Sequence, residues 1–189
     1  MSVRLRAAAA AAALLAATAG QASPAAFTVA SPDLVEGKWP NANLLAASYG
    51  FGCAGGNRSP RLDWTGAPAG TKSFVVNIHD IDAKTGVGWM HWVVINIPAG
   101  QTSLPGGIDA QGKSLPKGAL QTRTDFGVPG YGGPCPPKAE THRFQVTVTA
   151  LDIDHLPDAV TQDATPAMVG FYANQHALAK TMLEVRQPG

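Results

Sequence analysis

An aspartate and two histidines stand at the ends of apolar runs in this chain of 189 residues. Residues 73–97 (SFVVNIHDIDAKTGVGWMHWVVINI) contain two apolar segments joined by a short polar connection with glycines. Because alternate side chains of a strand share a face, Asp80 continues the face of Phe74, Val76 and Ile78. By the same rule, His91 begins the face of Val93, Ile95 and Ile97. An antiparallel hairpin of the two segments would place Asp80 and His91 at one end of a sheet, either as a functional pair or as a structural hydrogen bond.

A second histidine follows the same pattern later in the chain. Residues 142–151 alternate as a strand whose apolar positions are Phe144, Val146, Val148 and Ala150. His142 has the parity of this apolar set and is the first residue of the run. The sequence therefore predicts a carboxylate and two imidazoles, each at a strand end and each on an otherwise apolar face.

Several kinds of site are weighed for these groups. The spacing from Asp80 to Asp82 is not that of a calcium loop, because glycine and glutamate are missing where that loop needs them. No GxSxG or HExxH pattern occurs, so neither a serine hydrolase nor a zinc hydrolase is favoured, although a general acid–base enzyme using Asp80 and His91 stays open. Two imidazoles and backbone N–H groups suit a phosphate or carboxylate better. Four aromatic residues are expected as walls of such a pocket: Trp89, Trp92, Phe126 and Tyr131.

The N-terminal segment has the pattern of a secretory leader. Arg4 and Arg6 precede an alanine- and leucine-rich run, and small residues follow as far as Ala22. We expect residues 1–22 to be removed, leaving one domain, residues 23–189, in the periplasm or outside the cell. The apolar run is too short to cross a bilayer, and an uncleaved anchor is the alternative. Without two arginines of the leader the net charge changes from +1 to −1, so no basic excess favours nucleic acid.

The chain has two cysteines, Cys53 and Cys135, both in loops rich in glycine or proline. In an oxidising compartment such a pair predicts a disulfide, and two separate buried thiols are the alternative. Near the C-terminus, residues 166–180 are predicted to be a helix with Thr165 as N-cap and Pro166 in its first turn. The apolar residues of this region are expected to pack in the core: Met168, Phe171, Tyr172, Leu178 and Met182. A short strand is predicted to follow at residues 182–186.

Three segments resemble signatures of the phosphatidylethanolamine-binding protein family. Residues 80–84 (DIDAK) resemble D-P-D-A-P, and residues 89–96 (WMHWVVIN) resemble W-x-H-W-V-V-x-N. Residues 131–144 (YGGPCPPKAETHRF) are similar to Y-x-G-x-x-P-P-K-G-x-x-H-R-Y. The resemblance extends over nearly all of residues 23–189 and is that of the bacterial exported members.

The resemblance implies a mostly β fold: a large central antiparallel sheet, a smaller sheet packed on it, and a C-terminal helix. It also implies a small anion pocket made by Asp80, His91, Gly133, Pro136 and His142. The residues implied to support this pocket are Asp82, Trp89, Tyr131 and Phe144. The chain departs from the family signatures at four positions: Ile81 and Lys84 replace prolines, Ala139 replaces a glycine, and Phe144 replaces a tyrosine, which removes a hydroxyl.

The function that we expect is therefore binding rather than catalysis, without a cofactor or metal. The expected ligand is a small anion or a phosphoryl headgroup, and the protein is expected to be a monomer or homodimer that is not integral to a membrane. The alternative is an inhibitor or regulator whose protein partner docks at the rim of the same pocket.

Overall fold

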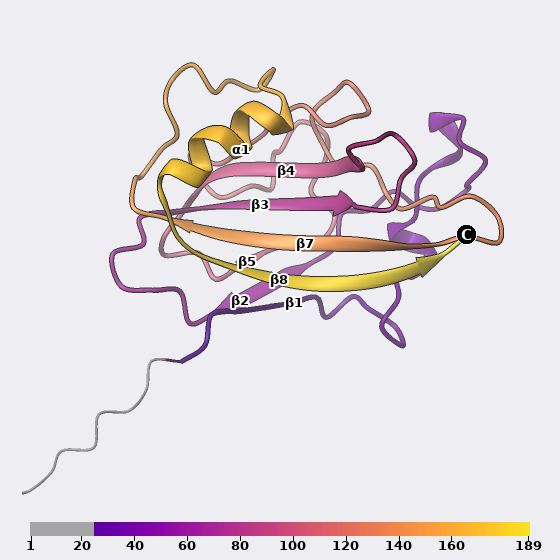
Figure 1. Cartoon of the computed structure of the whole chain (residues 1–189), viewed down its shortest axis with the longest axis horizontal. Helices are drawn as coiled ribbons and strands as arrows, with labels where there is room; N and C mark the ends of the chain where they lie inside the picture. Colours follow the sequence, from indigo (N-terminus) through magenta and orange to yellow (C-terminus); the bar gives the residue numbers. More distant parts are fainter. Residues whose placement is uncertain (1–24) are drawn as a thin grey trace, which may run out of the picture.

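The computed structural model describes residues 25–189, so the predicted leader lies outside the described residues. Two antiparallel sheets form the fold (Figure 1). The smaller sheet has the order β1–β2–β5, and its strands are Thr28–Ala30, Leu62–Thr65 and Ser103–Leu104. The larger has the order β6–β4–β3–β7–β8, and its strands are Leu120–Gln121, Trp89–Pro98, Ser73–Asp80, Thr141–Leu151 and Ala177–Pro188. Two short 3-10 helices, Asn41–Asn43 and Ala47–Tyr49, lie between β1 and β2, and the helix α1, Pro166–Gln175, precedes β8.

The two faces of the larger sheet bury different apolar clusters. One face packs against the small sheet, where Trp64 of β2 and Leu104 of β5 contact the cluster that contains Ile78 of β3 and Val146 of β7. The other face packs beneath α1, where Val169 and Ala173 join Val75 and Val93. Figure 1 shows α1 lying along the larger sheet near β4. The predicted mostly β fold of two sheets and a C-terminal helix is confirmed.

The predicted hairpin is confirmed, but the predicted face of β4 is wrong. β3 and β4 pair antiparallel, with Asp80 opposite Trp89, and the register shifts twice along the pair. Val93 and Ile95 pack beneath α1, whereas Ile97 packs toward the small sheet. One shift lies between the pairs Ile78–Trp92 and His79–Met90, so His91 is an extra residue in β4. A bulge of this kind turns the side chain to a face that simple alternation does not predict.

The predicted C-terminal helix is confirmed at its start and wrong at its end. Thr165 caps it, since its side chain accepts a hydrogen bond from the Met168 backbone N–H. The helix ends at Gln175 instead of residue 180, and β8 is a strand of 12 residues rather than the short one predicted. Ala177–Pro188 pairs with the whole of β7, from Leu151 to Thr141. Eleven cross-strand pairs outweigh the favourable helix propensity of the alanines, leucines and lysine in this segment.

The prediction that the apolar residues of this region pack in the core is also wrong in part. Phe171 is 64% exposed and Met182 is 52% exposed, and Leu178 also lies largely at the surface. The residues that α1 buries are Val169 and Ala173. Among residues 25–189, no helix has the length and apolar character needed to cross a bilayer.

Candidate functional site

A pocket of about 220 Å³ opens at the end of the large sheet where β3 stops and β4 and β7 start. Four titratable side chains line it: Asp80, Lys84, His91 and His142. The remaining lining residues are Leu45, Phe51, Ala83, Thr85, Trp89, Phe126, Cys135 and Pro137. The structure thus brings the three strand-end residues predicted from parity into one cavity, although His91 reaches it through the bulge.

Three aromatic rings form one wall of the pocket. Phe126 stacks edge-on against Trp89 and Phe51, with ring centroids 5.5 and 5.9 Å apart, and it lies 5.3 Å from the ring of His91. Phe51 belongs to the loop that the Cys53–Cys135 disulfide joins to the pocket, and this predicted disulfide is confirmed. The wall can therefore receive an apolar part of a ligand beside the titratable groups.

Asp80 holds the other side of the pocket together. Its Oδ1 accepts hydrogen bonds from the backbone N–H groups of Asp82 and Ala83, which fixes the loop after β3. Its Oδ2 lies 2.7 Å from Nδ1 of His142, and both side chains are buried. Asp80 therefore orients His142 across the β3–β7 pair, and not the neighbouring hairpin residue His91.

His142 lies between two carboxylates. Its second ring nitrogen, Nε2, is 3.2 Å from Oε2 of Glu140. A carboxylate oxygen can only accept, so both contacts are hydrogen bonds when both ring nitrogens carry protons. Burial acts to lower the pKa of His142, but the hydrogen bonds with Asp80 and Glu140 outweigh it and leave the pKa raised. The two carboxylates therefore favour the cationic form of His142.

His91 has the opposite character. Its Nδ1 lies 2.7 Å from the carbonyl oxygen of Gly132, so Nδ1 must be the protonated nitrogen that donates. Burial lowers the pKa of His91 to about 4, although the bond to Gly132 acts in the other direction. The ring is thus neutral at physiological pH, and its Nε2 carries a lone pair that accepts hydrogen bonds.

Lys84 and Glu140 complete the charges at the pocket rim. Nζ of Lys84 is 2.7 Å from Oε1 of Glu140, whose second oxygen faces His142. The hydrogen bond from Lys84 and then that from His142 lower the pKa of Glu140. Asp80, His142, Glu140 and Lys84 therefore form a chain of alternating charge that runs from the buried base of the pocket to its surface.

Four of the other predicted residues have structural partners of their own. Asp82 accepts from Nε and Nη2 of Arg143, and these bonds hold its pKa well below the usual range. The Tyr131 hydroxyl donates to the Asn43 carbonyl, and the Phe144 ring packs 5.1 Å from the His91 ring. Trp92 and Tyr131 were both expected in the wall, but both lie in the core instead, and Trp92 donates to Gln121.

The two backbone positions predicted from the third signature lie beside the cavity. The N–H of Gly133 donates to Oδ1 of Asn57 at 2.8 Å, so this donor is already engaged. Pro136 is buried, and its neighbours Cys135 and Pro137 contribute to the lining instead.

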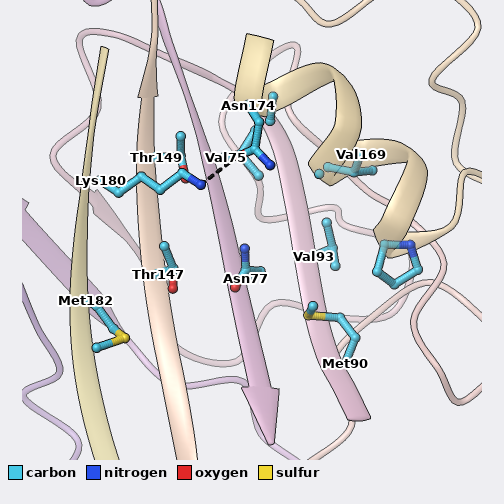
Figure 2. Close-up of a pocket in the computed structure, with 13 residues that line it drawn as sticks. Val75, Asn77, Met90, Val93, Thr147, Thr149, Val169, Asn174, Lys180 and Met182 are labelled. Atoms are coloured by element: carbon cyan, nitrogen blue, oxygen red, sulfur yellow. Dashed lines mark hydrogen bonds between the residues drawn. The ribbon is translucent and has the colours of Figure 1, made fainter. Parts of the chain in front are cut away.

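A second hollow of about 380 Å³ lies on the opposite face of the large sheet, beside α1 (Figure 2). Figure 2 shows Val75 and Asn77 on its floor, with Lys180 reaching across to Asn174. Lys180 is the single titratable residue among those that line it. The groove was missed because the helix was predicted to continue through Lys180, so that Lys180 was not placed on a strand beside β7.

Three residues of the candidate site, Glu140, Phe51 and Leu45, were also missed. Glu140 stands two positions before His142, so strand parity was a signal that both side chains face the same way. Phe51 stands two positions before Cys53, and the predicted disulfide to Cys135 was a signal that it lies near the third signature. Leu45 gave no comparable signal.

Comparison with known proteins finds relatives over most of the chain. Residues 36–187 match the family model described as phosphatidylethanolamine-binding protein. UPF0098 protein YbhB of Escherichia coli (strain K12) is 49% identical over 154 residues, which cover 81% of this chain and 94% of YbhB. UPF0098 protein YbcL of the same organism is 46% identical over 162 residues, 84% of this chain and 85% of YbcL. The crystal structure of Escherichia coli YbcL superposes with a TM-score of 0.81 and covers 87% of this chain and 99% of that one.

Proposed function

Because the chain belongs to the phosphatidylethanolamine-binding protein family, we propose that its pocket binds a phosphate-type oxyanion, free or as a phosphoryl headgroup, without turning it over. The observation that carries this proposal is the convergence of Lys84, His142 and His91 on one cavity of about 220 Å³. Two of these side chains are cationic donors, and the aromatic wall offers apolar contact for the remainder of a ligand.

The protonation state of His91 narrows the chemistry of the ligand. Both imidazoles were expected to hold the anion, but the bond from Nδ1 of His91 to Gly132 leaves Nε2 of this ring as an acceptor. Such an acceptor favours an oxyanion that carries its own proton. Near neutral pH inorganic phosphate is a mixture of the monoanion and the dianion, and both forms carry at least one P–OH group, whereas sulfate has a similar shape and no proton. The proposed pocket should therefore prefer inorganic phosphate to sulfate, and also to phosphorylethanolamine, because a phosphomonoester has largely lost its P–OH proton at pH 7.5.

Titration calorimetry at pH 7.5 with inorganic phosphate, sulfate and phosphorylethanolamine tests the proposal. Wild-type protein should bind phosphate at least tenfold more tightly than sulfate. His91→Ala should weaken phosphate binding by about ten- to a hundredfold, because a hydrogen bond to a charged group contributes about 1.5–3 kcal/mol. It should leave sulfate binding nearly unchanged, so that the preference for phosphate is lost.

Two further variants separate the site from its surroundings. Asp80→Asn should weaken binding less than His91→Ala, since Asp80 orients His142 and braces the loop at Asp82 and Ala83. His176→Ala is the control, because His176 pairs with Asp152 at the far end of β7. Equal binding by wild type and His91→Ala would place the anion elsewhere and refute the proposal.

The location of this binding protein is also a proposal. The leader pattern before Ser23 and the Cys53–Cys135 disulfide both support export to an oxidising compartment. N-terminal sequencing of the protein from a periplasmic fraction tests it, and an intact Met1 in the cytoplasmic fraction would contradict it.

A further inference from the structure

The carboxylate of Glu140 lies between Lys84 and His142, the two cations of the pocket. One oxygen of its carboxylate is 2.7 Å from Nζ of Lys84, and the other is 3.2 Å from Nε2 of His142. Both cations line the pocket, whereas Glu140 is not one of the lining residues. The two donors that we assign to an oxyanion are thus already bound to a carboxylate of the same chain.

We infer that Glu140 is an internal anion that holds Lys84 and His142 in the ligand-free protein and is displaced from them by an incoming phosphate. This inference rests on the proposed function, since it concerns the affinity of the same pocket. It assigns Glu140 as a residue that sets anion affinity by competition rather than by contact with the ligand.

The contacts of Glu140 are of a kind that a ligand can replace. Its side chain is one-third exposed, and its partner Lys84 is 77% exposed. Water screens and competes with an exposed ion pair, which makes the pair weak compared with a buried one. By contrast, the Asp80–His142 pair at the base of the pocket is only 6% exposed on both sides, and we expect it to persist when the anion binds.

The backbone around Glu140 is held independently of its side chain. Its N–H donates to the Pro137 carbonyl, and its own carbonyl accepts from the N–H of Gly189. The carboxylate can therefore turn away from the pocket by side-chain rotation while the turn before β7 keeps its hydrogen bonds. For the same reason, replacing the side chain should not unfold this turn.

The residue also has a matched counterpart that makes the inference testable. Asp152 is another carboxylate hydrogen-bonded to a histidine, with Oδ1 3.0 Å from Nδ1 of His176. It directly follows β7, at the end opposite Glu140. Glu140→Gln and Asp152→Asn each remove one negative charge and break one carboxylate–histidine pair, but only the first does so at the pocket.

Titration calorimetry with inorganic phosphate at pH 7.5 on wild type, Glu140→Gln and Asp152→Asn decides the question. Glu140→Gln should tighten phosphate binding by about fivefold, the factor expected when an exposed ion pair no longer has to be broken. Asp152→Asn should stay within about twofold of wild type, which would exclude a general effect of net charge. Glu140→Ala, which cannot accept any hydrogen bond, should change affinity in the same direction as Glu140→Gln.

The outcomes separate this inference from the proposed function. If wild type binds phosphate and Glu140→Gln binds it equally or more weakly, Glu140 is part of the binding site or irrelevant to it, and the inference is overturned alone. If neither protein binds phosphate, both the inference and the proposed function are overturned. Binding that becomes measurable only in Glu140→Gln supports both.

Discussion

Acidification should destabilise this protein through His91, and the structure gives the size of the effect. His91 is buried and donates from Nδ1 to Gly132, and burial lowers its pKa from 6.5 to about 4. In the unfolded chain the ring regains a pKa near 6.5 and takes up a proton below that value. The contribution of the neutral ring to stability is therefore fully present above pH 6.5 and is lost as the pH falls toward 4.

The size of the stability loss follows from the difference between the pKa values of His91 in the unfolded and the folded chain. A shift of about 2.5 pKa units corresponds to about 3 kcal/mol in full, and about 2 kcal/mol of it is lost between pH 7.5 and pH 5.0. His142 contributes with the opposite sign, because its pKa is raised, and its stabilisation is present in acid and lost as the pH rises through the folded-state pKa. The total pH dependence is thus a sum, and the His91 part must be measured as a difference between two proteins.

The variant His91→Asn provides that difference. The asparagine amide nitrogen can take the place of Nδ1 and donate to Gly132, but the side chain does not titrate. Urea unfolding followed by tryptophan fluorescence at pH 7.5 and pH 5.0 should show that wild type loses about 2 kcal/mol more than the variant over this interval. The control is His155→Asn, which replaces an exposed histidine after β7. Its free energy of unfolding should fall by as much as that of wild type over the same interval.

An equal loss of unfolding free energy in wild type and His91→Asn between pH 7.5 and pH 5.0 would refute this prediction. Such a result would mean that the buried ring is protonated in the folded protein at little cost. The neutral tautomer, and with it the expected preference for phosphate over sulfate, would then have to be abandoned.

Three further predictions concern the fold and the processing of the chain. Reducing the Cys53–Cys135 disulfide, which spans 82 residues, should lower stability by roughly 4 kcal/mol, and calorimetry should show a lower unfolding midpoint with reductant than without it. Gly133→Ala should destabilise the protein by several kcal/mol, because the added Cβ would meet the Asn43 carbonyl oxygen and lie 2.5 Å from the Leu45 backbone nitrogen. Gly170→Ala in α1 is the control and should not destabilise the protein, because a Cβ there meets nothing within 4 Å. Equal urea midpoints for the two variants would contradict this account. Mass analysis of the exported protein should give an N-terminus near Ser23, and a mass that still includes residues 1–22 would contradict cleavage.

Local periodicity and short signatures determined much of the architecture. The parity of β7 is correct throughout, since Phe144, Val146, Val148 and Ala150 all enter the core between the sheets. Alternation predicts the buried face of such a strand, because a shift of its pairing register by one residue would expose all of these apolar side chains to solvent. The disulfide could also be predicted from the sequence, because Cys53 and Cys135 are the only two cysteines in the chain.

Only the tertiary structure decided how the pocket is arranged. The bulge at His91 depends on how β4 pairs with β3, and no alternation within β4 reveals it. Likewise, Asp80 meets His142 and not His91, because β7 pairs with β3 from 62 residues away. The segment after Gln175 becomes β8 for the same reason: pairing with all of β7 outweighs local helix propensity. Contacts between distant strands thus set the charge and tautomer of each group, while the sequence alone set which groups stand at the strand ends.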